Sequence, residues 1–183
     1  MKTRIIITIA AFLFVFPLSI YAQHKAFVPA DFVVPYSLEN EHFRIRMLSI
    51  NDVVKDYDAV MSSIDHLKKM FPTSSWPSPD LSFEQDLIDL GWHQKEFQRR
   101  SSFAYTVVSL DESEVLGCLY INPTTKTDYD VSISMWVRAS EVENGLDPIL
   151  FETVKTWISK EWPFQKVAYP GREIPWNEWS SLK

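Results

Sequence analysis

Three strand-like runs that follow one another closely constrain this chain more than any other feature of its sequence. They cover residues 103–110, 115–121 and 130–138, and short polar segments separate them. Apolar runs of this length joined by short polar turns are typical of consecutive antiparallel strands. The middle of the chain is therefore expected to form an antiparallel sheet.

The segment after these runs changes to helical spacing and then back to a strand. Asp147 and Pro148 suit the N-cap and the first position of a helix, and apolar residues then recur on one helical face. A short strand is expected at 167–169. A strand, a helix and a strand form a βαβ unit, so the strands at 130–138 and 167–169 are expected to run parallel.

The segment before the runs predicts one strand and two helices. Residues 43–47 alternate apolar and charged side chains, which indicates a half-buried strand. Helical spacing follows at 57–71 and at 83–97, and Ser82 with Gln85 makes a capping-box pattern ahead of the second helix. The fold class is therefore α+β, with a mixed and mostly antiparallel sheet flanked by helices.

The start of the chain predicts an export signal. Lys2 and Arg4 form a basic start, residues 5–16 are almost entirely apolar, and Ala22 offers a small residue for cleavage. The apolar run is shorter than the about 20 residues that a membrane span needs. The alternative is an uncleaved anchor, which is the only membrane contact we expect. Both place the domain outside the cytoplasm, either periplasmic or secreted.

Length and composition limit the organisation and the partners. A chain of 183 residues has room for one ordinary domain. We expect a signal at 1–22, an extended leader at 23–37 and one domain at 38–183. The formal net charge of −6 repels phosphates, so no nucleic-acid partner is expected. Cys118 is the single cysteine and no histidine has metal-ligand spacing, so no metal is expected.

The order of elements and three stretches of sequence resemble the GNAT superfamily of acyl-CoA-dependent N-acyltransferases. The matching stretches are residues 43–48 followed by Asn51 and Asp52, residues 114–119, and residues 134–138 with the loop and helix after them. The resemblance implies a GNAT-like domain that moves an acyl group from acyl-CoA to an amine. It implies acetyl-CoA as the cofactor and an amine of a small molecule or peptide as the acceptor.

The resemblance places the cofactor at the loop that follows residues 130–138. In that family, backbone N–H groups at the start of the next helix hold the pyrophosphate. The expected cofactor contacts are Val137, Arg138, Gly145 and Leu146. The same loop also carries the carboxylates of Glu141, Glu143 and Asp147, which repel phosphates. We therefore expect acetyl-CoA to bind weakly or not at all, and a plain strand-to-helix connection is the alternative.

Two residues are candidates for the proton transfers that an N-acyl transfer needs. Asp130 shares its strand face with Ser132 and Ser134, and it is the expected base. Tyr169, at the end of the last strand, is the expected acid. The alternative for each residue is a structural role.

The C-terminal end is short for the family. Residues 170–183 are too few for the further helix and two strands that usually complete a GNAT domain. Two functions therefore stay open. The first is an N-acyltransferase. The second is an exported, non-catalytic binding module derived from the GNAT fold, which the acidic loop, the short end and the export signal favour together.

Overall fold

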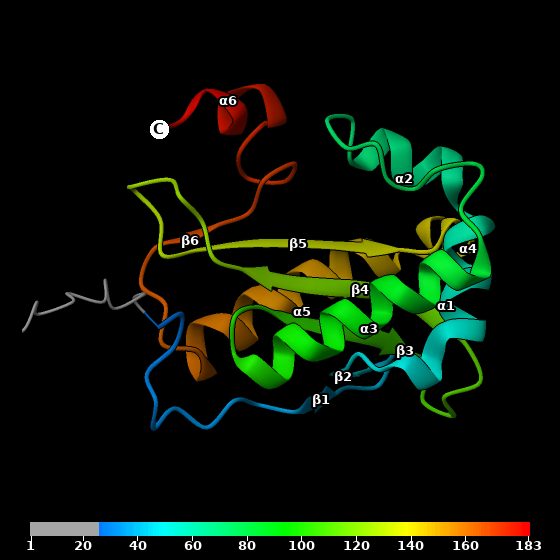
Figure 1. Cartoon of the computed structure of the whole chain (residues 1–183), viewed down its shortest axis with the longest axis horizontal. Helices are drawn as coiled ribbons and strands as arrows, with labels where there is room; N and C mark the ends of the chain where they lie inside the picture. The colour runs from blue at the N-terminus through cyan, green and yellow to red at the C-terminus, as the bar shows by residue number, and fades with distance from the viewer. Residues whose placement is uncertain (1–25) are drawn as a thin grey trace, which may run out of the picture.

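A six-stranded sheet forms the centre of the protein, and helices cover both of its faces (Figure 1). The computed structural model describes residues 26–183, so the predicted export signal lies outside the described residues. The elements in chain order are β1 (Ser37–Glu39), β2 (Arg44–Met47), the 3-10 helix η1 (Ile50–Asp52), α1 (Val53–Met61), α2 (Ile64–Met70), α3 (Phe83–Arg99), β3 (Phe103–Val108), β4 (Val115–Asn122), β5 (Val131–Val137), α4 (Ala139–Val142), α5 (Leu146–Glu161), β6 (Val167–Ala168) and α6 (Trp176–Ser181).

The strands follow one another across the sheet in the order of the sequence. Strands β1 to β5 pair antiparallel with their neighbours, and β6 pairs parallel with β5. The α+β class, the antiparallel runs and the parallel βαβ unit are therefore confirmed. Strand β1 is an addition, because the sequence pattern predicted no strand before β2.

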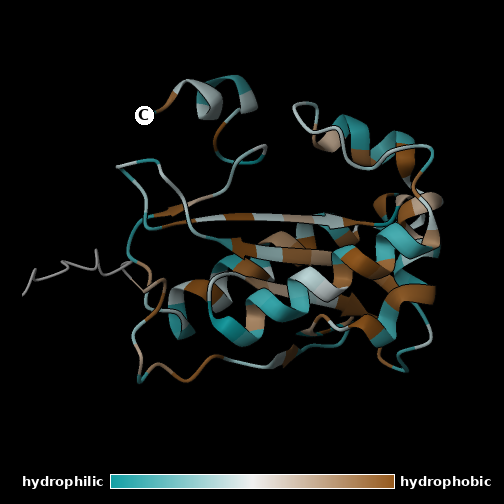
Figure 2. Ribbon diagram, in the orientation of Figure 1, coloured by the Kyte–Doolittle hydropathy of each residue, from teal (hydrophilic) through white to brown (hydrophobic). Residues whose placement is uncertain are grey.

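Alternation along the strands builds two cores, one on each face of the sheet. The residues Val131, Ile133, Met135 and Val137 of β5 are buried against the inner side of α5. Trp136, from the same strand, is buried in the opposite core with residues of α1, α2 and α3. Figure 2 shows hydrophobic residues along the central strands and polar residues on the outer sides of the helices. We call these two sides the α5 face and the α3 face.

The helix at 83–97 starts as its sequence predicts, and the helix at 57–71 does not continue as one piece. The backbone N–H of Gln85 donates to Ser82 Oγ, and that of Ser82 donates to the Gln85 side chain, so the capping box is confirmed. The first helix ends at Met61, and α2 starts only at Ile64. Ser63 lies in this break, where its Oγ accepts the backbone N–H of Ala139 at 2.9 Å.

The described part of the leader packs on the domain. Val28 and Val34 are buried with the core of the α5 face. The Arg100 guanidinium donates to the carbonyl oxygen of Pro29, and the Tyr105 hydroxyl donates to that of Pro35 at 2.6 Å. These contacts join the leader to α3 and β3, and Val28 and Val34 add their side chains to the core.

The C-terminal end forms one short helix, α6. Trp176 donates its indole N–H to the carbonyl oxygen of Met70 at 2.9 Å, which links the start of α6 to the end of α2. The segment that leads from β6 to α6 lies beside β5, where the Arg172 side chain donates to the carbonyl oxygen of Met135. Among residues 26–183, no helix has the length and apolar character that crossing a membrane requires.

Candidate active site

Strand β5 has an edge that β6 leaves largely free. The two strands pair only at Val131 with Val167 and at Ser132 with Ala168, near the start of β5 (Figure 1). The backbone N–H of Arg138 donates to β4, and backbone groups in an antiparallel pair alternate in direction. The backbone groups of Met135 and Val137 therefore face away from β4, toward the edge beyond the reach of β6.

The side chain of Arg172 lies against this edge. It donates to the carbonyl oxygen of Met135 at 3.4 Å, and it makes two short bonds to the Asp147 carboxylate, at 2.6 and 2.8 Å. A guanidinium that holds a carboxylate through two parallel bonds is a strong and directional pair. Arg172 therefore connects the C-terminal segment to both β5 and the start of α5.

The start of α5 can offer backbone donors to an anion. Its N-cap is Gly145, which has a positive φ of 74°, and open space surrounds its Cα on the side where a Cβ would stand. The first N–H groups of a helix have no partner inside the helix, and here they belong to Leu146 and Asp147, since Pro148 has none. The prediction that Asp147 is the N-cap is wrong, because Gly145 is the N-cap and Asp147 is the second residue of the helix. The carboxylate of Asp147 accepts hydrogen bonds from Arg172.

The structure brings together three of the four expected cofactor contacts. Val137 ends the free edge of β5, and Gly145 and Leu146 start α5. Arg138 turns the other way, toward α1, where it donates to Asp58 at 3.0 Å and lies 3.7 Å from Glu114. Its guanidinium is therefore engaged on the α3 side of the loop.

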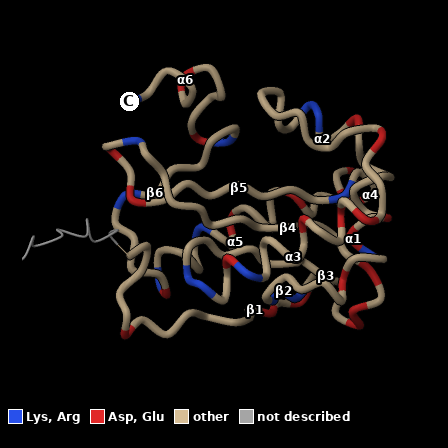
Figure 3. The backbone as a smooth tube through the Cα atoms, in the orientation of Figure 1, with Lys and Arg blue, Asp and Glu red and all other residues tan. Residues whose placement is uncertain are grey.

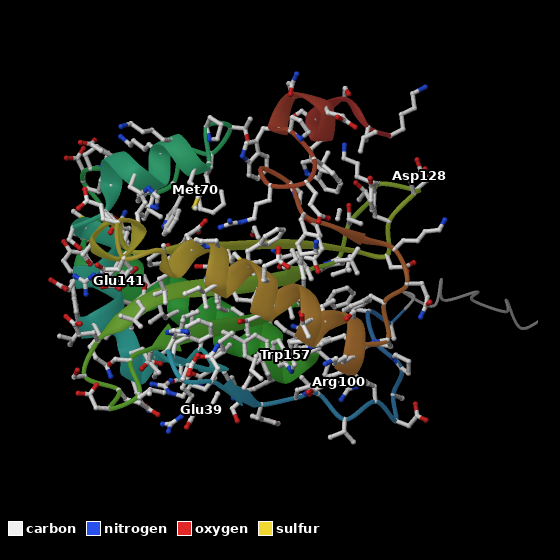
Figure 4. The ribbon with its side chains drawn as sticks, turned by 180° about the vertical axis from the view of Figure 1, so that it is seen from behind. Glu39, Met70, Arg100, Asp128, Glu141 and Trp157 are labelled. Atoms are coloured by element: carbon white, nitrogen blue, oxygen red, sulfur yellow. The ribbon has the colours of Figure 1, made fainter. Side chains whose placement is uncertain are left out.

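The acids of the loop after β5 are arranged less unfavourably than the sequence suggested. Glu141 accepts a hydrogen bond from the side chain of Asn144 at 3.2 Å, and Glu143 is exposed to solvent. Asp147 is neutralised by Arg172. In Figure 4, which views the molecule from the α5 face, Glu141 lies at the end of the sheet where α4 is found. Figure 3 shows acidic residues gathered around α1 and α4.

A pocket of about 410 Å³ lies on the α3 face, beside the same strand. Residues of α1, α3, β4 and β5 and of the segment after α2 line it. The side chains that matter for its chemistry are Asp56, Trp76, Asp86, His93, Tyr120 and Ser134. Because side chains alternate along β5, Ser134 points into this pocket while the backbone of Met135 faces the strand edge. Strand β5 therefore separates the pocket from the edge by its own width only.

Burial raises the pKa values of the two buried carboxylates of this pocket toward neutral pH. Asp56 is 4% exposed, and burial, with the nearby charge of Asp86, raises its pKa to about 7. Burial and the charge of Asp89 raise the pKa of Asp86 to about 6. Burial lowers the pKa of His93, so its ring is neutral at pH 7. Carboxylates with pKa values near neutrality are suited to acid–base chemistry.

The two expected catalytic residues lie outside this pocket. Asp130 Oδ2 accepts the backbone N–H groups of Gln165 and Lys166, both at 2.9 Å, and so holds the turn into β6. Tyr169 is buried in the core of the α5 face against Phe151, and burial raises its pKa to about 12. Asp130 therefore stabilises a turn, Tyr169 packs in the core, and the two side chains do not share a site.

The acidic residues of the pocket were missed by the sequence reasoning. Asp86 and His93 are seven positions apart on α3, on the same helical face as Leu90, which packs in the core. Polar residues within an otherwise buried helical stripe are a signal that could have found them. Asp56 gives the same signal on α1, between the buried Val53 and Val60.

Within the described residues, no group of three or more His, Cys, Asp or Glu side chains could hold a metal ion.

In sequence, the chain matches no family profile and no curated protein. In structure, it is similar to the ribosomal-protein-S5-alanine acetyltransferase of Vibrio fischeri, with a TM-score of 0.60 and 17% identity over 74% of this chain and 73% of that one. It is also similar to the apo form of RimL, a ribosomal L7/L12 α-N-protein acetyltransferase, with a TM-score of 0.57 and 15% identity over 75% of each chain.

A third similar structure is the same L7/L12 acetyltransferase in complex with coenzyme A, with a TM-score of 0.56 and 15% identity over 71% of each chain. At these identities the likeness concerns the fold. The protein has the GNAT fold, as the resemblance in its sequence predicted.

Proposed function

We propose that this protein is an N-acyltransferase that moves an acyl group from an acyl-CoA thioester to an amine held in the acidic pocket. One observation carries the proposal: the free edge of β5 and the pocket of tuned carboxylates lie on either side of the same short stretch, Ser134 to Val137. A donor along the edge and an acceptor in the pocket would meet across one strand.

The donor side has backbone groups suited to an extended, amide-bearing chain and to phosphates. Met135 and Val137 offer N–H and C=O groups along the edge, as one strand offers them to the next. The start of α5 offers the N–H groups of Leu146 and Asp147 at the positive end of the helix dipole. A structure of the same fold that holds coenzyme A supports this choice of donor.

Binding of the acyl donor along this edge of β5 requires the Arg172 side chain to move. Arg172 now occupies the edge at the carbonyl oxygen of Met135 and pairs with Asp147. A pyrophosphate at the start of α5 would compete with Asp147 for the same guanidinium, because both offer anionic oxygens to it. We infer that Arg172 exchanges Asp147 for phosphate when the donor binds, which would also clear the edge of β5.

The acceptor side has a base of suitable strength. Asp56, with a pKa near 7, takes the proton that the amine nitrogen loses as it bonds to the acyl carbon. The carbon–sulfur bond breaks in the same reaction, the thiolate that leaves takes up one proton from solvent, and Asp56 returns to solvent the proton that it took from the amine. Acyl-CoA supplies the activated acyl group, and the residues of this chain hold the amine, remove its proton and keep the two substrates adjacent.

A thiol-release assay with acetyl-CoA and a panel of amines tests the proposal. The folded protein should give little background, since its single cysteine, Cys118, is buried. Thiol release that depends on an amine, with the acylated amine identified by mass spectrometry, would support it. Asp56→Asn should lower kcat by roughly a hundredfold, in line with the loss of a general base. Failure to bind or use any acyl-CoA would favour the alternative of a non-catalytic binding module.

We also propose that the domain is exported, on the strength of the basic start, the apolar run and Ala22. Mass spectrometry of the protein made in a secreting host should find a mature N-terminus close after Ala22. An intact Met1 in a soluble cytoplasmic fraction would contradict export. The acyl acceptor would then be an amine of a small molecule or peptide in the cytoplasm.

A further inference from the structure

Asp86 is the side chain of the pocket that the rest of the protein leaves short of partners. It lies near the start of α3 and is only 2% exposed. Its Oδ2 atom is buried and accepts no hydrogen bond from the described residues 26–183. Burying a carboxylate oxygen without donors costs free energy, and such an oxygen in a native protein calls for an explanation. A ligand that donates a hydrogen bond to Asp86 Oδ2 from inside the pocket would explain it.

The charges around Asp86 select the sign of that ligand. The pocket is lined by Asp56, Asp86 and Asp89, and by neither lysine nor arginine. Asp56 is buried with its Oδ1 atom 3.4 Å from Cys118 Sγ, whereas Asp89 is exposed to solvent. The carboxylates of Asp56 and Asp86 are therefore buried, and that of Asp89 is accessible to solvent. Together they make the electrostatic potential inside the pocket negative. A cation is the ligand that this arrangement attracts.

The walls of the pocket add an apolar and aromatic surface. Phe71 and Trp76 stand edge to face with their ring centroids 6.3 Å apart, and the His93 ring lies 5.1 Å from that of Tyr120. Such faces favour ammonium groups and the carbon chains next to them. At the about 30 Å³ that one water molecule takes up in the liquid, a volume of about 410 Å³ has room for about 14 water-sized groups.

We propose that the pocket binds a flexible alkylamine with two or more ammonium groups, and that Asp86 holds the ammonium that does not react. This rests on the proposed function, because the other nitrogen is the one that accepts the acyl group. Asp86 is on α3 and Ser134 on β5, so a ligand that touches both spans the pocket from helix to sheet. An amine with only one nitrogen can satisfy one end alone.

Titration calorimetry of the full chain without any acyl donor tests this inference. The probes are putrescine and spermidine, which carry two and three amino groups, and butylamine, which keeps the carbon chain and loses the second ammonium. Putrescine and spermidine should bind. The affinity for butylamine should be lower by a factor of roughly ten or more, because one charge-assisted bond is lost. This comparison uses the unaltered protein, so it does not depend on any variant folding.

A matched pair of variants locates the site. Asp86→Asn should weaken spermidine binding roughly tenfold or more. Glu84→Gln removes a charge two residues away on the same helix, but Glu84 is exposed and outside the pocket, so spermidine binding should stay within about twofold. Circular dichroism checks that both variants keep the fold.

Equal binding of butylamine and putrescine, or equal loss in both variants, would overturn the inference. The result is separate from that of the proposed function. Diamine binding without acyl transfer would keep the cation site and reject the enzyme. Acyl transfer to other amines without diamine binding would keep the enzyme and reject the cation site.

Discussion

Arg172 holds Asp147 through two hydrogen bonds of 2.6 and 2.8 Å, although 25 positions separate the two residues in the sequence. The pair lies where the free edge of β5 meets the start of α5, at the place where the proposed function needs positive potential for phosphates. From the sequence, this loop had three acids and one arginine. In the structure its arginine, Arg138, faces α1, and an arginine from the C-terminal segment takes the place beside α5.

The first prediction concerns this pair and the affinity for acetyl-CoA. Asp147→Asn removes a negative charge from the start of α5 and releases the Arg172 guanidinium, so acetyl-CoA should bind roughly three- to tenfold more tightly. Arg172→Ala should weaken binding by a similar factor, because the remaining Asp147 is then an unpaired acid. Calorimetry on the two single variants measures both effects. Tighter binding in Arg172→Ala would mean that Arg172 only blocks the edge.

The second prediction concerns the two other acids of the loop. Changing both Glu141 and Glu143 to Gln removes two negative charges near the expected phosphate site, and acetyl-CoA should bind more tightly. The gain should be larger at low salt, where charges of exposed residues are less screened. Calorimetry at two salt concentrations measures it. If the unaltered protein already binds with micromolar affinity and the double change has no effect, these acids do not act on the site.

The third prediction concerns the packing of the C-terminal segment. Gly171 has a φ of 77°, and a Cβ added there would stand 2.4 Å from the indole nitrogen of Trp176. Gly171→Ala should therefore lower the free energy of unfolding through both backbone strain and displacement of Trp176. Gly145→Ala is the matched control, since its φ of 74° brings the same strain while open space surrounds the new methyl group.

The two glycine variants separate strain from packing. Gly145→Ala should cost about 1 kcal/mol, and Gly171→Ala about 1–3 kcal/mol more, since overpacking adds to the strain. Urea unfolding followed by tryptophan fluorescence measures both. Equal costs would mean that Trp176 moves aside freely and that the segment is held by its other contacts, such as Arg172 with Asp147.

The fold could be predicted from the sequence because its signals are local. The alternation in β5, the capping box of Ser82 and Gln85, and the βαβ order each depend on residues close together in the chain. The site could be predicted only in part. Val137, Gly145 and Leu146 could be placed near one another because they belong to one local loop, and their role as cofactor contacts stays a prediction. The link between Arg172 and Asp147 depends on how a later segment returns to the sheet.

The acidic pocket escaped prediction for a related reason. Asp56 and Asp86 come from two helices, and nothing in either segment alone says that the two carboxylates share one cavity. The alternation along β5 predicts that Asp130 shares a face with Ser134, and Ser134 lines the pocket, whereas Asp130 does not. The backbone N–H groups of Gln165 and Lys166, which come from the turn before β6, hold its carboxylate instead.

The last prediction concerns the pH dependence of stability, to which Asp86 contributes. Its pKa is 3.8 when unperturbed and about 6 in the folded protein, so the folded state keeps a proton that the unfolded chain has already released. Stability from this group is therefore complete below about pH 4, and it is lost as the pH rises through about 6. Asp86→Asn cannot ionise, so it should avoid that loss.

At about pH 8 the Asp86→Asn variant should thus be more stable than the unaltered protein by on the order of 2 kcal/mol, and at about pH 4 the difference should be small. Asp56, Asp89, His93, Tyr120 and Cys118 also face this region, and they are present in both proteins. Urea unfolding across this pH range measures the difference, with Glu84→Gln as the control that should show no such trend. Parallel stability curves for Asp86→Asn and the unaltered protein would contradict the raised pKa. A stabilising loss of Asp86 would mean that the native protein keeps a costly buried carboxylate, as expected if a cationic ligand of the pocket needs it.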